Sequence, residues 1–248
     1  MWFGGIGAVV VAVVLATAAA SAGAAGDATV PAQRCRAGTL QRLIAPKVAY
    51  AAIVRRPVAV RRRPDGPAFA HFGRRNVNGV RTVFGVWSGV VGPDCSAEWY
   101  RVQLPLRPNG ATGYVRASRV RLARVFTRIS VDLSARRLTL LRSGRPLLRA
   151  RVAIGAPDTP TPTGRYYVNQ RLLAADPSGP YGPGALGVSA FSRVLTGWTQ
   201  GGPIAIHGTN QPWSIGHAIS NGCVRVRNAI VRKLFRLAYA GTPVVIHP

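Results

Sequence analysis

One histidine and one cysteine in the last quarter of the sequence have the types of a nucleophile and its base. His207 follows the apolar run Ile204-Ala205-Ile206, which predicts a strand that carries the histidine to a loop. Cys223 lies in a second predicted loop. A thiol is a weak nucleophile until it loses its proton, and an imidazole can take that proton or stabilise the thiolate. The pair predicts covalent catalysis; a buried, inert cysteine beside a hydrogen-bonded histidine is the alternative.

Gly222, directly before the cysteine, and Arg225, two residues after it, both suit this chemistry. Gly222 lets the backbone turn tightly and bring N–H groups toward a developing oxyanion. Arg225 could lower the pKa of the thiol or bind a substrate carboxylate through two hydrogen bonds. His, Cys, Asp and Glu show no ligand spacing anywhere in the sequence, so we expect no metal and no cofactor.

Strands are the elements predicted to position these residues. Apolar alternation predicts strands over 127–133, 138–141 and 147–154, joined by tight turns. The proline-dense segment 155–166 predicts an ordered extended loop, because proline cannot sit in a central strand. The segment 170–202 is rich in Gly, Pro and Ser with weak periodicity, and predicts a long loop or flap.

A single helix is predicted after the cysteine loop. Asn228 is in position to cap it, and Gly241 to end it. A last strand is predicted over 242–246. The apolar residues of this segment recur at helical spacing: Ile230, Val231, Leu234, Phe235 and Ala238. The C-terminal half is therefore expected to be mostly β, with one helix packed against it.

The first half of the chain predicts a small all-β barrel. Between 48 and 122, short apolar runs alternate with turn signals such as Asn78-Gly79. The order of Glu98-Trp99-Tyr100-Arg101-Val102 and then Gly113-Tyr114-Val115 resembles the final strands of bacterial SH3-like domains. A plain small barrel without that kinship is the alternative.

Four motifs in the second half resemble the YkuD-type L,D-transpeptidase catalytic domain. They are G-x-P-D-T-P-T-P-T-G at 155–164, I-x-I-H-G-T-N at 204–210, S-N-G-C-V-R at 220–225 and G-T-P-V-V-I at 241–246. Many members of that family read S-H-G-C where this chain reads S-N-G-C, so Asn221 stands in place of a second imidazole. His217 lies between the motifs and is a weaker candidate to replace it.

The resemblance implies acyl transfer on peptidoglycan stem peptides. Cys223 would be the nucleophile and His207 its base. The sulfur would attack the carbonyl carbon of the bond between a diamino acid and a terminal D-alanine. A side-chain amine from a second stem would then accept the acyl group, giving a 3→3 cross-link. Water as acceptor would make the protein an L,D-carboxypeptidase, and a catalytically weak cell-wall-binding protein is a further alternative.

The same resemblance gives the surrounding residues their expected roles. The oxyanion would be held by the backbone N–H of Cys223 and a neighbour. Arg225 is expected to anchor a substrate carboxylate or the motif loop. Ser220 is expected to orient the loop or the histidine, and Gly208 and Thr209 to shape the pocket.

The N-terminus predicts export from the cytoplasm. An apolar run from Ile6 to about Ala20 is followed by Ala20-Ser21-Ala22, which is typical of a signal-peptidase site. The expected organisation is a signal peptide or uncleaved anchor at 1–25, a linker at 26–46, an SH3-like β-barrel at 47–124 and a YkuD-type catalytic domain at 125–248.

Three cysteines remain after the apolar run. An odd number in an oxidising compartment leaves at least one thiol unpaired. The economical interpretation joins Cys35 to Cys95 and leaves Cys223 for chemistry. The alternative is that Cys35 and Cys95 are both unpaired and inert.

The sequence carries a formal net charge of +26, almost all of it from arginine. A surface of this kind favours anionic neighbours. For an exported chain these are peptidoglycan carboxylates, anionic cell-wall polymers or a membrane surface. Nucleic acid is disfavoured by the export segment and by the lack of a recognised binding motif. A compositional bias of the genome would explain the charge equally well, so charge alone does not identify a partner.

Overall fold

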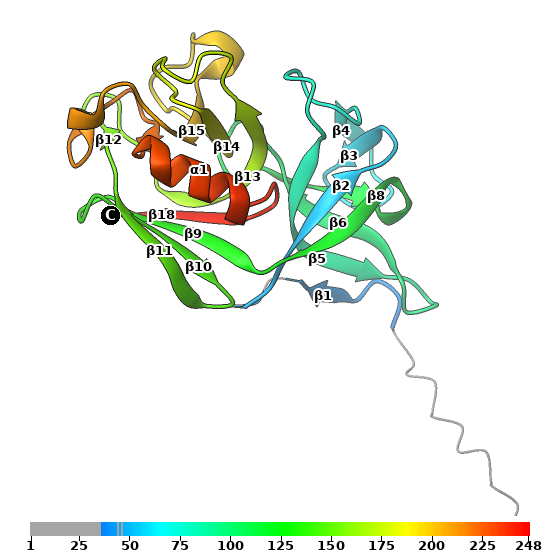
Figure 1. The fold of residues 1–248 in the computed structure, drawn as a ribbon. Helices are drawn as coiled ribbons and strands as arrows, with labels where there is room; N and C mark the ends of the chain where they lie inside the picture. The colour runs from blue at the N-terminus through cyan, green and yellow to red at the C-terminus, as the bar shows by residue number, and fades with distance from the viewer. Residues whose placement is uncertain (1–35, 44, 46) are drawn as a thin grey trace, which may run out of the picture. The chain divides into compact units, whose positions relative to one another are not determined.

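The computed structural model describes residues 36–43, 45 and 47–248, and nearly all of its strands lie in two mainly antiparallel sheets (Figure 1). The predicted signal peptide at 1–25, most of the linker at 26–46 and Cys35 lie outside the described residues. Within the described ranges, no helix is long and apolar enough to cross a membrane.

The first sheet contains the strands predicted between 48 and 122, together with two that were not predicted: β1, in the segment predicted to be a linker, and β4. Its hydrogen-bonded order is β4-β3-β7-β6-β5-β2-β8, with β1 paired to β5. Its strands are β1 Leu40–Arg42, β2 Ala49–Val54, β3 Val58–Arg61, β4 Ala68–Phe72, β5 Val83–Val91, β6 Ala97–Gln103, β7 Thr112–Arg116 and β8 Val120–Val125. The apolar runs thus confirm an all-β N-terminal region, while its kinship to SH3-like domains stays a prediction.

The second sheet has the order β11-β10-β9-β18-β13-β14-β15-β17. β18 lies at its centre, parallel to β9 and antiparallel to β13. β12 and β16 form a separate two-stranded parallel sheet. The strands are β9 Thr127–Asp132, β10 Arg137–Arg142, β11 Arg145–Arg151, β12 Ile154–Gly155, β13 Gly164–Leu173, β14 Gly184–Phe191, β15 Pro203–His207, β16 Ala218–Ser220, β17 Val224–Arg225 and β18 Pro243–His247.

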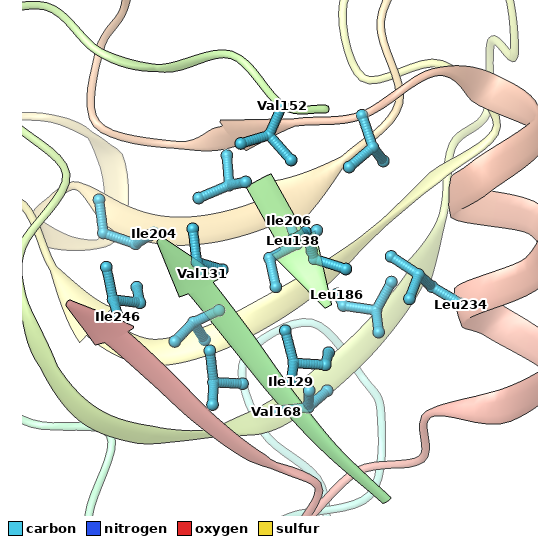
Figure 2. Packing of buried hydrophobic residues seen from close by; sticks show 14 of the residues in the cluster. Ile129, Val131, Leu138, Val152, Val168, Leu186, Ile204, Ile206, Leu234 and Ile246 are labelled. Atoms are coloured by element: carbon cyan, nitrogen blue, oxygen red, sulfur yellow. The ribbon is translucent and has the colours of Figure 1, made fainter. Parts of the chain in front are cut away.

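The core of the second half forms where alternate residues of these strands meet the helix. Strand side chains point to opposite faces in turn, so each strand contributes every second residue to the core. Figure 2 shows Ile129, Leu186, Ile206 and Ile246 from four strands converging with Leu234 of α1 (Asn228–Leu237). Burying an aliphatic side chain of this size contributes about 1.5–3 kcal/mol.

The helix begins one residue earlier than its predicted cap requires. Asn228 is the first helical residue, and the capping position is Arg227, which makes no side-chain capping bond. The Oδ1 atom of Asn228 instead accepts the backbone N–H of Thr209 at 2.8 Å. The prediction of a helix here is confirmed, but the predicted cap is wrong because a loop from the histidine motif occupies the asparagine oxygen.

The predicted flap over 170–202 is confirmed only in part, because two strands interrupt it. Its first residues extend β13 to Leu173, and Gly184–Phe191 forms β14, which pairs with both β13 and β15. Only 174–183 and 192–202 are irregular, the latter containing a short 3₁₀ helix at Thr199–Gly201. The strand was hidden because it contains two glycines, two alanines and no charged residue, so no regular apolar–polar alternation predicts a strand.

Candidate active site

His207 is the last residue of β15 and is buried, with 4% of its surface exposed. It pairs with Ala185 of β14 on one side and with Arg225 of β17 on the other. The sequence places it there because Ile204 and Ile206 alternate into the core and leave the intervening positions for the opposite face.

The imidazole has a defined tautomer. Its Nδ1 lies 2.5 Å from the carbonyl oxygen of Gly208, and a carbonyl can only accept, so Nδ1 carries the proton. Nε2 is left with its lone pair. Burial lowers the pKa of His207 to about 4; the bond to Gly208 acts in the opposite direction, and the charge of Arg225 adds to the lowering. The ring is therefore neutral at neutral pH and able to accept a proton.

Cys223 is a free thiol between β16 and β17, and it lies on the wall of a cavity of about 690 Å³. Burial raises the pKa of the thiol, while the backbone N–H of Ala205 and the charge of Arg225 act to lower it. The thiol is thus protonated at rest, next to a donor and a cation that favour the thiolate once it forms.

The strand register brings the two residues to one face of the sheet. Ile206 pairs with Val224 and His207 with Arg225 in parallel strands. Cys223 precedes β17 and receives the N–H of Ala205, so it is a diagonal neighbour of His207. The two side chains therefore lie on the same face of the sheet, in neighbouring segments.

The turn that carries the thiol is fixed by hydrogen bonds. The hydroxyl of Ser220 donates to the carbonyl oxygen of Cys223 at 2.6 Å and accepts the N–H of Gly222 at 3.2 Å. Gly222 has φ +102°, a conformation in which other residues are strained. With its N–H directed to Ser220, the N–H of Cys223 is the remaining candidate within this turn for an oxyanion donor.

The proline-dense segment braces this turn from outside. The backbone N–H of Ala156 and the hydroxyl of Thr159 both donate to the carbonyl oxygen of Ser220, each at 2.9 Å. Gly155 pairs with Ser220 across β12 and β16. The segment is an ordered loop up to β13, as its prolines predict, and its function here is to hold the cysteine loop in place.

Arg225 lies beside both members of the pair. Its Nη1 donates to Oε1 of Gln211 at 2.8 Å, whereas its buried Nε has no partner among the described residues. Its charge lowers the pKa of both His207 and Cys223, so it favours a neutral ring and a thiolate. A buried, unused donor on a guanidinium is suited to a carbonyl or carboxylate of a substrate.

The other predicted residues surround the pair without forming one cluster. Gly208 and Thr209 hold the loop after the histidine: a Cβ at Gly208 would lie 2.4 Å from Oδ1 of Asn228, which receives the N–H of Thr209. Asn221 lines the cavity. His217 is exposed and makes only backbone hydrogen bonds, so its side chain does not replace the missing imidazole.

Three residues at the site were missed from the sequence. The ring of Tyr181 lies edge-on to His207, with centroids 4.9 Å apart and planes at 61°. Gln211 holds Arg225, and Asn228 holds the loop at Gly208–Thr209. None carries a motif signal, since each comes from a distant or irregular segment; only Gln211, next to the I-H-G-T-N motif, could have been suspected.

Cys95 is disulfide-bonded, whereas Cys223 is free. The predicted partner Cys35 lies outside the described residues, so the pairing stays a prediction. Across the part of the chain that the structure describes, no group of three or more His, Cys, Asp and Glu side chains gathers in a way that could hold a metal ion.

Comparison with known proteins finds similarity in the second half of the chain. Residues 127–246 match the family model described as "YkuD: L,D-transpeptidase catalytic domain". The Bacillus subtilis (strain 168) protein named "Putative L,D-transpeptidase YkuD" is 37% identical over 119 residues, which is 48% of this chain and 65% of that protein. A Bacillus licheniformis protein of the same name is 36% identical over 49% of this chain and 66% of its own length. The chain therefore spans just under two thirds of these relatives.

Solved structures give weaker likenesses. The structure described as "L,D-transpeptidase from Mycobacterium smegmatis" is 17% identical, covering 68% of this chain and 91% of that one, with a TM-score of 0.40. A TM-score of this size does not establish a shared fold. The family match and the Bacillus relatives support a YkuD L,D-transpeptidase catalytic domain in the second half of this chain.

Proposed function

With a YkuD L,D-transpeptidase catalytic domain supported at residues 127–246, we propose that this protein forms 3→3 cross-links between peptidoglycan stems through a Cys223 acyl-enzyme. One observation carries the proposal. A free thiol on a cavity wall lies diagonally across two strands from a neutral histidine whose Nε2 is free to accept a proton.

The first half-reaction starts from a neutral pair. The pKa of the histidine is lowered and that of the thiol is raised, so a resting thiolate–imidazolium pair is disfavoured. His207 Nε2 takes the thiol proton as the sulfur attacks the carbonyl carbon before the terminal D-alanine. The C–N bond then breaks, the proton passes to the departing amine, and a thioester to Cys223 remains.

The second half-reaction returns the enzyme to its starting state. The side-chain amine of a second stem attacks the thioester carbonyl and gives a proton to His207. The C–S bond breaks and the sulfur regains that proton, leaving a new amide bond between the two stems. If water enters in place of the amine, the product is a tripeptide and the activity is that of a carboxypeptidase.

Two groups support the charged stages of this path. The backbone N–H of Ala205 and the guanidinium of Arg225 stabilise the sulfur as it becomes negative. The Nε of Arg225 is buried and has no partner among the described residues, so it could donate to a carbonyl or carboxylate of the stem only if the side chain shifts on binding. Since the stems lie outside the cytoplasm, the proposal includes export by the predicted signal peptide.

The decisive experiment is mass spectrometry of disaccharide-tetrapeptide muropeptides incubated with the mature protein and with its Cys223→Ala variant. Dimers lacking one D-alanine, absent with the variant, are the expected products. Tripeptides without dimers would replace the transpeptidase by a carboxypeptidase. No product from a folded wild-type protein would overturn the enzyme proposal and favour a wall-binding role.

A further inference from the structure

The wall of the cavity at Cys223 is uncharged. Its polar side chains are amides and hydroxyls, among them Asn78, Gln170, Gln200 and Asn221, although the chain has 33 Lys and Arg residues. A charged group removed from water needs an ionic partner, whereas a peptide carbonyl needs only a donor. This wall is therefore suited to the neutral backbone of a peptide.

One of these amides comes from the first sheet. The turn between β4 and β5 places Asn78 in the cavity wall. Asn76 shapes the turn, because its Oδ1 accepts the backbone N–H groups of Asn78 at 3.0 Å and Val80 at 3.3 Å. A short, internally bonded turn of this kind presents its side chains in a fixed direction.

Gln170 is directed to the cavity by an irregularity in its strand. The pairing of β13 with β14 shifts between Val168, which pairs with Val188, and Gln170, which pairs with Gly187. A bulge of this kind reverses the face to which the following side chain points. Val168 lies in the core, and Gln170 lines the cavity. Gly187 leaves it room, since a Cβ there would lie 2.6 Å from its Cγ.

The first sheet determines which end of the Gln170 amide is available. Its Oε1 accepts from Nδ2 of Asn76 at 2.7 Å and from Nδ2 of Asn78 at 2.9 Å. Both acceptor sites of that oxygen are then used. The Nε2 donor has no hydrogen-bond partner among the described residues, and the side chain lines the cavity.

We propose that Gln170 is a positioning residue whose Nε2 donates to a backbone carbonyl oxygen of the acyl-donor peptide, and that Asn76 and Asn78 of the first sheet fix it in that orientation. The inference rests on the proposed function and deepens it. It gives the N-terminal sheet a direct part in substrate binding, through the amide cluster of Asn76, Asn78 and Gln170.

Binding of a synthetic tetrapeptide stem ending in D-alanine to the Cys223→Ala protein, measured by calorimetry, tests the inference without turnover. Gln170→Glu keeps an oxygen for both asparagines and replaces the donor by an acceptor, so we expect affinity to fall about tenfold at neutral pH. Gln170→Ala should lower it about fivefold and Asn78→Ala about threefold.

Asn109→Ala is the matched control. Asn109 also joins the two halves, exchanging two hydrogen bonds of 2.8 Å with the backbone of Phe191, but it does not line the cavity. Its affinity should equal that of the parent. The rate of Cys223 alkylation by iodoacetamide, measured with the cysteine retained, should be unchanged in Asn109→Ala.

The pH dependence separates a hydrogen bond from a packing effect. A protonated glutamic acid can donate, so the Gln170→Glu defect should shrink as pH falls through the usual range of glutamate, about 4.3. Parental affinity in Gln170→Glu at neutral pH, or an equal loss in Asn109→Ala, would overturn the inference alone. A parent that binds no tetrapeptide would overturn the proposed substrate as well.

Discussion

The strands that carry the candidate catalytic pair have two faces of opposite character. Toward the helix, they present fully buried aliphatic side chains: Val168, Leu186, Ile204, Ile206 and Val224. Toward the cavity, they present small or polar ones: Gln170, Ala185, Gly187 and Ala205. The first face supplies hydrophobic stabilisation, and the second leaves open space beside the reactive groups. Substitutions on the two faces should therefore have separable effects.

The largest expected effect is on the cavity face. Cys223→Ala removes the nucleophile and should lower the rate of transfer at least about a thousandfold. The free energy of unfolding should change by less than about 1 kcal/mol, because one side of the thiol faces the cavity and not packed side chains. Product formation and urea unfolding of the two proteins measure both. A loss of stability as large as that of a core substitution would contradict the expectation that substitutions on the two faces have separable effects.

Leu186→Ala probes the core face between two cavity-lining residues, Ala185 and Gly187. Removing a fully buried leucine side chain should cost about 3 kcal/mol of unfolding free energy. Activity per folded molecule should stay within about twofold of wild type, since the side chain points away from the cavity. Urea unfolding together with active-site titration separates the two quantities.

The pH profile tests how strongly the cavity face is shielded from water. Because burial lowers the pKa of His207 to about 4, the base stays unprotonated well below the usual range of histidine. The rate of acylation should be level from about pH 5 to 7 and fall about tenfold per unit below about 4. Circular dichroism at each pH controls for unfolding. An inflection near 6.5 would mean that the ring is solvated in the active protein.

Ala185→Val is expected to have the smallest effect. Ala185 pairs with His207 and lines the cavity, so two added methyl groups would intrude on the substrate. We expect kcat/KM to fall about fivefold. Stability should change by only a few tenths of a kcal/mol, as valine is well suited to strands. Unchanged kcat/KM would place the substrate farther from β14.

The sequence anticipated what alternation and motif order encode. β5 (Val83–Val91) is one of the apolar runs predicted between 48 and 122, and α1 follows the spacing of Val231 and Leu234. His207 at a strand end and Cys223 in a loop were also anticipated. In these segments the local pattern agrees with the environment, because one face is polar or exposed and the other is apolar.

The failures share a physical cause. β14 reads Gly-Ala-Leu-Gly-Val-Ser-Ala-Phe, with Leu186 and Val188 in the core and Ala185 and Gly187 on the cavity, so no polar alternation marks it as a strand. The bulge before Gln170 changes the face of the sheet to which this side chain points, and no glycine or proline at the bulge indicates it in the sequence. Asn78 and Asn228 reach their partners across long stretches of sequence, and no local pattern contains such contacts.

The central place of β18 affects how this sheet can assemble during synthesis. β18 joins β9 to β13, yet it leaves the ribosome after every other strand of the sheet. At roughly 5–20 residues per second, β9 waits on the order of ten seconds for its parallel partner. Until then the hairpins on either side of the gap keep unpaired edges and the helix has no complete surface to cover. The strands bearing His207 and Cys223 therefore become part of a continuous sheet only at the final stage of folding.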